Sequence, residues 1–308
     1  MGKELFINNE TFRKWMLLLD KQIEDIIDIS IIEIMYSNVK KKSDKFSRLL
    51  YSHPAIFMIE YSLAQCLLDE GIIPDYVFGS SMGEFAACAI ADALDLENII
   101  LAIIEQAFTL EQKCPEGSLI TILGDQSMYE NILMIKENSE LAGINFKSHF
   151  VISTDLERKS IIEKFLKDNN IEYYISPVSR AFHSSLIEPA KDTYISFLKK
   201  QFYKSPKIPI ISSTYADFIY NIHETYLWDI IRKPVLINET IKKIESVHEC
   251  IYLDLGPTGT MANFIKYNLE AKSNSIFFPI ITPFSNDLAN FYKLKDWFVK
   301  NNKIKHLM

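Results

Sequence analysis

Residues 76–90, which read YVFGSSMGEFAACAI, constrain the fold of this chain more than any other stretch. An apolar run with strand character ends at a turn in which two glycines flank a serine, and a helical segment of small residues comes directly after it. The chain has only nine glycines in 308 residues, so two of them beside one serine need a reason. A sharp strand-to-helix turn crowds the backbone and provides that reason. The stretch therefore predicts a strand covered by the next helix, which is the repeating unit of α/β folds.

The composition allows a large core and gives little support to a nucleic-acid partner. Hydrophobic residues make up 48% of the chain and the mean hydropathy is near zero, so one or two globular units are expected. The formal net charge is −7, and the lysines are dispersed except for a run that is expected to be a solvated loop: Lys40, Lys41, Lys42 and Lys45. We therefore predict no nucleic-acid binding.

The cysteines and the hydropathy predict a cytoplasmic protein that does not enter a membrane. Four cysteines lie far apart without CxxC pairing, which indicates reduced core thiols and no metal site: Cys66, Cys88, Cys114 and Cys250. No run of about 18 apolar residues occurs, and the N-terminus is too charged for a signal peptide.

Two rhythms of helix and strand divide the chain. The first part of the chain predicts a parallel sheet covered by helices. Helical spacing occurs at 10–34 and 55–68, a strand is expected at 75–78, and helices are expected from residue 82 onward and over 96–112. From 118 the order becomes strand, helix, two strands, helix, strand, a ferredoxin-like βαββαβ unit. The α/β rhythm resumes after residue 183, with strands in 208–213, 250–257 and 276–282. We predict a large α/β-hydrolase-like subdomain (1–117 and 187–308) with an inserted ferredoxin-like subdomain (118–186).

The pentapeptide 79–83 fits the G-x-S-x-G pattern of a nucleophile elbow. It lies directly between a strand and a helix, as that interpretation requires, and the helix N-terminus would favour negative charge developing beside Ser81. The pentapeptide alone leaves a second interpretation open, in which Ser81 is a helix N-cap in a glycine-tolerant turn.

Among six histidines, His183 is the best candidate for the base that a serine nucleophile needs. It lies where the inserted unit returns to the main domain, and clefts form at such boundaries. The other five are expected to be surface or structural residues, because they precede a proline, lie in the inserted unit, or lie in polar stretches or the tail: His53, His149, His223, His248 and His306.

Five motifs together resemble the malonyl-CoA:acyl-carrier-protein transacylases and the acyltransferase domains of polyketide synthases. They are FGSSMGEFAA, CPEGSLITILG, AFHSSLIEPA, RKPV and LDLGPTGTMANF, in this order over essentially the whole chain. The chain is most similar to the stand-alone acyltransferase homologues of trans-acyltransferase polyketide clusters, some of which are acyl hydrolases. The resemblance implies a Ser-His dyad of Ser81 and His183, with the N–H of Met82 as an oxyanion donor and the carbonyl of Ile230 orienting the histidine.

Two departures from the family pattern concern the acyl pocket. Ser80 stands where the pattern GHSxGE has its histidine, so we expect an altered pocket shape. Gln106 stands where the family carries the arginine that binds the malonyl carboxylate, and a neutral amide cannot neutralise that charge. Malonyl is therefore expected to be a poor substrate, unless Arg180 serves as another cation. Phe182 fits the family's variants with a tight acyl pocket.

A third departure concerns the start of the chain. The family begins with a strand and a GQGSQ-like loop that supplies the second oxyanion donor, whereas this sequence opens with MGKELF, which resembles the segment directly after that loop. We expect the given start to be incomplete. A protein that truly lacked the strand would have unpaired edges in a buried sheet and lower activity.

The sequence predicts an acyl hydrolase that releases acyl groups from the phosphopantetheine of polyketide carrier proteins. The alternatives are a malonyl- or acyl-CoA:carrier-protein acyltransferase and an inactive homologue that binds carrier proteins. A lipase-type hydrolase is disfavoured by the order of its catalytic residues, in which the histidine follows an acidic residue and lies near the C-terminus. His183 lies far from the end of this sequence. No bound cofactor is expected, since coenzyme A or the carrier's phosphopantetheine is part of the substrate. The protein is expected to be a monomer, with Arg232 and Lys233 as a basic rim for an acidic carrier protein.

Overall fold

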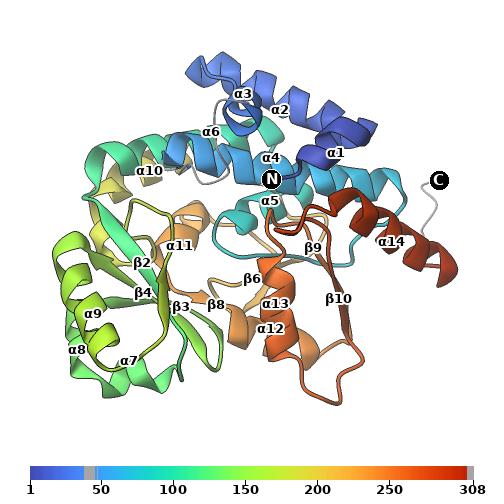
Figure 1. The fold of residues 1–308 in the computed structure, drawn as a ribbon. Coiled ribbons are helices and arrows are strands. Elements are labelled where there is room, and N and C mark those ends of the chain that lie inside the picture. Colours follow the sequence, from blue (N-terminus) through green and yellow to red (C-terminus); the bar gives the residue numbers. More distant parts are fainter. Residues whose placement is uncertain (38–45, 47, 304–308) are drawn as a thin grey trace.

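The computed structural model describes residues 1–37, 46 and 48–303 of the chain (Figure 1). The predicted lysine loop at 40–45 and His306 lie outside the described residues. Helices form most of the first part of the chain: α1 (Lys3–Asn8), α2 (Glu10–Ile27), α3 (Ile31–Tyr36), α4 (Leu49–Asp69), α5 (Met82–Ile90) and α6 (Leu96–Lys113). The predicted helical region 10–34 is two helices, because Asp28 ends α2 in a left-handed conformation and the Ser30 side chain caps α3.

The parallel core consists of two separate pieces. In the first, β1 (Val77–Gly79) pairs in parallel with β6 (Ile210–Ser212), and β7 (Asp217–Ile219) adds antiparallel to β6. In the second, β9 (Ile251–Asp254) pairs in parallel with β10 (Ile276–Pro279). Within the described ranges no strand joins β1 to β9, and a cavity of about 870 Å³ is lined by residues 76–80 and 250–258. The predicted parallel strands are confirmed, but they do not form one continuous sheet.

The inserted unit has the predicted ferredoxin-like order and its own apolar core. Its elements are β2 (Gly117–Ile122), α7 (Ser127–Asn131), α8 (Leu133–Asn138), β3 (Glu140–Phe146), β4 (His149–Asp155), α9 (Leu156–Asp168) and β5 (Tyr173–Ile175). The strands are ordered β5-β2-β4-β3 and are all antiparallel. The single helix expected after the first strand of this unit is two short helices. Both the fold class and the ferredoxin-like insertion are confirmed.

The last part of the chain closes the large subdomain and reaches the small one. Its elements are η1 (Ser185–Ala190), α10 (Lys191–Leu198), α11 (Tyr226–Arg232), β8 (Val235–Leu236), α12 (Ile237–Glu245), α13 (Thr260–Asn268) and α14 (Asp287–Lys300). β8 pairs in parallel with β3 and so extends the small subdomain's sheet. Figure 1 shows α11 and β8 between the small subdomain and the rest of the molecule, so the chain directly after α11 lies at the junction.

The cysteines and the helices concern two predictions, that the thiols are reduced and lie in the core and that the chain does not enter a membrane. Every cysteine is a free thiol, and Cys66, Cys88 and Cys114 are buried, as expected for core thiols, whereas Cys250 is only half-buried. In the described part of the chain, no helix is both long enough and apolar enough to cross a bilayer.

Candidate active site

The serine turn connects β1 to α5 by a close backbone approach at one of its two glycines. A Cβ on Gly79 would lie 2.3 Å from the nitrogen of Glu84, so only glycine fits there. A Cβ on Gly83 would meet nothing closer than the Glu60 carboxyl oxygens at 3.8 Å, which is ordinary contact. Ser81 itself has a φ of 50°, a conformation that non-glycine residues seldom adopt and that is often found at functional sites.

The Ser81 hydroxyl contacts His183 and does not cap the helix. Its Oγ lies 3.1 Å from Nε2 of His183, and no side-chain capping hydrogen bond is made at the start of α5. The structure thus brings together a serine and a histidine 102 positions apart, at the distance that proton transfer requires. Of the two interpretations that the pentapeptide leaves open, the geometry favours the nucleophile elbow.

Main-chain carbonyls at the end of α11 hold His183 in place. Its backbone N–H donates to the carbonyl of Ile231 and its Nδ1 donates to the carbonyl of Lys233, both at 2.8 Å. Because a carbonyl only accepts, the proton is on Nδ1, and the lone pair of Nε2 faces Ser81.

The prediction of Ile230 as the orienting residue is wrong, because the orienting carbonyl belongs to Lys233. Ile230 is fully buried inside α11, whereas Lys233 is the C-cap, where the chain becomes extended (φ −84°, ψ 155°) just before Pro234. This change of direction points the Lys233 carbonyl out of the helix and toward the imidazole.

The surroundings of His183 keep its imidazole neutral at neutral pH. Burial lowers the pKa of His183 to about 4, the hydrogen bond to the Lys233 carbonyl opposes this, and the positive charge of Arg232 lowers it further. A neutral imidazole with a free Nε2 lone pair can accept the serine proton.

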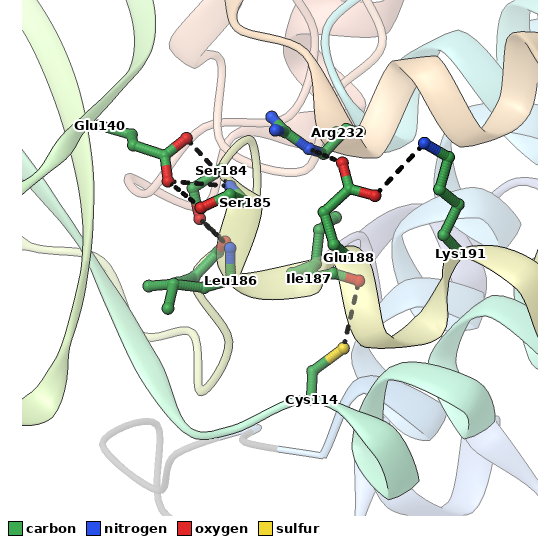
Figure 2. Close-up of polar contacts among 10 residues, drawn as sticks. Cys114, Glu140, Ser184, Ser185, Leu186, Ile187, Glu188, Lys191 and Arg232 are labelled. Atoms are coloured by element: carbon green, nitrogen blue, oxygen red, sulfur yellow. Dashed lines mark hydrogen bonds and ion pairs between the residues drawn. The ribbon is translucent and has the colours of Figure 1, made fainter.

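The turn after His183 is tied to both subdomains (Figure 2). Glu140 of β3 accepts hydrogen bonds from the backbone N–H of Ser185 at 2.9 and 3.0 Å and from its hydroxyl. Glu188 accepts from Nε of Arg232 at 2.7 Å and lies 3.4 Å from Nζ of Lys191. The position of His183 therefore depends on contacts from the small subdomain and from the end of α11.

Two predicted residues flank the nucleophile. Met82 is the first residue of α5, so its N–H has no acceptor within the helix and is available to a developing oxyanion. Ser80 lines the 870 Å³ cavity between β1 and β9. Ser81, His183 and Gln106 are not among the residues that line this cavity, so the role of Ser80 in the acyl pocket stays a prediction.

Gln106 is fully buried on α6 and pairs with a histidine from α4. Its Oε1 lies 2.8 Å from Nδ1 of His53, and its Nε2 has no hydrogen-bond partner. The ring of Phe182 lies 5.5 Å from the His53 ring and 6.3 Å from the His183 ring, so Phe182 connects this pair to the dyad. Burial lowers the pKa of His53 to about 4, so both members of the pair are neutral at neutral pH.

Arg180 is held at the end of α6 by main-chain oxygens. Its guanidinium donates to the carbonyls of Leu110 at 3.1 Å, Ser179 at 3.1 Å and Glu111 at 2.9 Å. Cations stabilise the C-terminal end of a helix through its exposed carbonyls. We therefore correct the interpretation of Arg180 as a cation for the acyl pocket and assign it to capping α6.

Two further residues of the site were not identified by sequence reasoning. His53 was expected to be a surface or structural residue, and only the packing of α4 on α6 reveals its pairing with Gln106. Lys233 contributes its main-chain carbonyl, which every residue has. The sequence indicates this role only through Pro234, which ends the helix just before it. The suggested basic rim is paired with acids, since Lys233 lies 3.1 Å from Asp229 and Arg232 donates to Glu188.

Metal-ligating side chains do not gather in the part of the chain that the structure describes. Among those residues, no group of three or more His, Cys, Asp or Glu side chains could hold a metal ion. What the dyad itself can do is acylate and deacylate a serine, with one imidazole moving the proton in both steps.

Comparison with known proteins shows the family of this chain. The family model "Acyl transferase domain" matches residues 1–302. The chain belongs to the acyl transferase family. The curated relatives of this chain include a "Polyketide biosynthesis acyltransferase homolog PksD" of Bacillus subtilis, 43% identical over 94% of this chain and 90% of that protein. A second, BaeD of Bacillus velezensis, has the same description and is 40% identical over 96% of this chain and 91% of that protein.

Solved structures show the same fold at lower identity. A loading acyltransferase from the avermectin modular polyketide synthase superposes with a TM-score of 0.87 at 17% identity, covering 97% of this chain and 95% of that one. MCAT from Streptococcus pneumoniae gives a TM-score of 0.77 at 18% identity, covering 96% and 95%. The chain therefore shares the core and the ferredoxin-like subdomain of both structures.

Proposed function

We propose that this protein is an acyl hydrolase that removes acyl groups from the phosphopantetheine thioesters of polyketide carrier proteins. The observation that carries the proposal is the neutral pair of His53 and Gln106 beside the dyad. A carboxylate left without a cation in a buried pocket costs roughly 2–5 kcal/mol, which disfavours malonyl by a factor of tens to thousands. A protein that does not load malonyl but keeps a serine and a base in contact is better suited to releasing acyl groups from carrier proteins than to loading them.

The chemistry would proceed in two steps through the dyad. Ser81 Oγ attacks the thioester carbonyl while His183 Nε2 takes its proton, and the N–H of Met82 donates to the oxyanion. The thiol of the carrier leaves with the proton from His183, which gives an ester on Ser81. Water then attacks this ester, His183 again takes and returns the proton, and the free carboxylic acid leaves. Lys233 keeps Nδ1 as the donor, so Nε2 can act as the base in both steps.

The partners and setting are part of the same proposal. Relatives of this chain are described as polyketide biosynthesis proteins, so the carrier proteins of a polyketide synthase are the proposed partners. The protein is proposed to act as a cytoplasmic monomer, without a bound cofactor.

Intact-mass measurement of the protein and of its carrier tests the proposal. The purified protein is incubated with acetyl- and butyryl-carrier protein and, separately, with malonyl-CoA plus free carrier. Hydrolysis predicts loss of acyl groups from the carrier, abolished by Ser81→Ala and His183→Ala, with little malonyl on the protein. Efficient transfer of malonyl to the carrier would show an acyltransferase. Carrier binding without any acyl transfer or release would show an inactive homologue.

Substitution of Gln106 tests the substrate argument directly. Gln106→Arg places a cation where the structure has a neutral amide, so we expect malonyl loading of Ser81 to increase at least tenfold. Gln106→Lys is the matched control, because it adds the charge without the paired donors of a guanidinium, and it should increase loading less. Unchanged malonyl loading in Gln106→Arg would contradict the assignment of this residue to the pocket.

A further inference from the structure

The side-chain amide of Gln106 is buried with one end paired and the other end unpaired. Its Oε1 accepts a hydrogen bond from His53 at 2.8 Å, while its Nε2 has no partner. An unpaired buried donor is costly, and nearly all such groups in proteins have an acceptor. The free NH2 of Gln106 is therefore a donor that a ligand could satisfy.

The structure pairs Oε1 of Gln106 with Nδ1 of His53, which leaves the NH2 of the amide free. Because Oε1 can only accept, this arrangement has the proton of His53 on Nδ1. A half turn of the amide would require that proton to move to Nε2, so the amide orientation and the His53 tautomer are coupled. The low pKa of His53, about 4 because of burial, keeps the ring neutral, so the pair adds no charge to the pocket.

The Phe182 ring is near both the ring of His53, which pairs with this amide, and the ring of His183. The Phe182 ring lies 5.5 Å from the His53 ring and 6.3 Å from the ring of its neighbour His183, whose Nε2 faces Ser81. The two arginines closest to this region along the chain are engaged elsewhere, Arg180 by carbonyls and Arg48 by Glu111 at 2.8 Å. Neither arginine therefore supplies a positive charge to the pair of His53 and Gln106.

We propose that the Gln106 NH2 donates a hydrogen bond to an uncharged oxygen of the acyl chain, such as a 3-oxo or 3-hydroxy oxygen, and that His53 is the residue that positions it. This inference rests on the proposed function, because it names the acyl class that the same site accepts. It separates three classes of acyl group. Oxygenated neutral chains are favoured, plain alkyl chains leave the donor unpaired, and carboxylate chains lack a cation.

Three thioesters on one pantetheine carrier test the role of Gln106. They are butyryl, 3-oxobutyryl and 3-hydroxybutyryl, which have the same chain length and differ at one carbon. For the native protein we expect kcat/KM to be about tenfold higher for both oxygenated chains than for butyryl, the value of one buried hydrogen bond. Gln106→Leu should make the three substrates equivalent. Retained discrimination in this variant would overturn the proposal.

Substitutions of His53 test its positioning role. Without the histidine donor, as in His53→Leu, the amide can rotate and present Oε1. A 3-oxo group only accepts hydrogen bonds, so 3-oxobutyryl should lose its advantage. The 3-hydroxy group can also donate, so 3-hydroxybutyryl should keep most of its advantage. His53→Asn restores an N–H donor and should restore the 3-oxo preference. A purely structural role of His53 would lower all three rates alike.

Binding to Ser81→Ala separates this inference from the proposed function. Pantetheine amides of the same three acyl groups cannot be cleaved, and calorimetry gives their dissociation constants without turnover. Suppose that the amides of the two oxygenated chains bind more tightly than the butyryl amide, but the native protein hydrolyses none of the thioesters. This result would reject the hydrolase and retain the inference. Equal affinities for all three amides would overturn the inference, and a buried water as the partner of Gln106 would give that result. Thermal unfolding of each variant checks that it is folded.

Discussion

The two glycines beside Ser81 differ in what their backbone positions allow. Gly79→Ala would place a Cβ 2.3 Å from the nitrogen of Glu84, so the turn would have to shift. We expect the free energy of unfolding to fall by about 2–4 kcal/mol and acylation of Ser81 to be lost. Gly83→Ala is the matched control, because it meets only the Glu60 oxygens at 3.8 Å and alanine suits a helix better. Denaturant unfolding of both variants measures the difference, and equal stability would contradict the close-approach argument.

The titration of His183 predicts the acid side of the pH profile. Only the neutral imidazole can take the proton of Ser81, and burial lowers the pKa of His183 from 6.5 to about 4. The rate of Ser81 acylation should therefore stay constant as the pH falls below 6.5 and should decrease only near pH 4. Single-turnover acylation followed by mass between pH 4 and 8 measures this. A midpoint near 6.5 would show that His183 is solvated in solution.

At the scale of elements, one buried carboxylate connects α5 to β6 and α11. Glu84 accepts hydrogen bonds from the hydroxyls of Ser212 at 2.8 Å and Ser213 at 2.7 Å. It also accepts from the backbone N–H of Thr214 at 3.0 Å, from the hydroxyl of Thr214 at 2.9 Å and from the hydroxyl of Tyr226. It lies in the first turn of the helix directly after Ser81, and Tyr226 begins the helix whose end orients His183. The carboxylate therefore links the elements that carry the nucleophile to those that hold the base.

Removing this carboxylate should destabilise the protein and loosen the dyad. Glu84→Ala leaves several buried donors without an acceptor, so we expect a loss of about 3–5 kcal/mol in the free energy of unfolding. Glu97→Ala is the control, since Glu97 also lies in the first turn of a helix but is exposed, and it should change stability by less than about 0.5 kcal/mol. Urea unfolding compares the two, and similar losses would contradict the role given to the Glu84 network.

The sequence predicted the elements that local pattern determines and missed contacts that depend on packing. The strand, turn and helix around Ser81 are specified by residues that are neighbours in the chain, and so is the βαββαβ order of the insert. The pairing of His53 with Gln106 joins residues 53 positions apart on α4 and α6, and neither helix pattern specifies which polar groups meet. The orienting carbonyl at Lys233 depends on where α11 ends, and helix boundaries are the least predictable part of a helix.

At the scale of the whole molecule, the two sheets differ in how their strands are flanked. In the small subdomain β2 lies between β5 and β4, and β4 lies between β2 and β3, so both strands have two neighbours. In the large subdomain, the described strands β1 and β9 have one neighbour each, and the 870 Å³ cavity lies between them. A strand with one open edge has fewer hydrogen bonds to break when it opens locally.

This asymmetry predicts that protection against hydrogen exchange is distributed unevenly. Amides of residues 77–79 and 251–254 should exchange faster than those of 117–122 and 149–155, although β1 and β9 belong to the subdomain with the larger apolar core. Exchange of the 308-residue chain followed by mass spectrometry of peptides measures this order. Equal or slower exchange in β1 and β9 would mean that both edges are paired in solution. Added denaturant should leave the order unchanged until global unfolding, because local opening of β1 and β9 does not require the small subdomain to unfold.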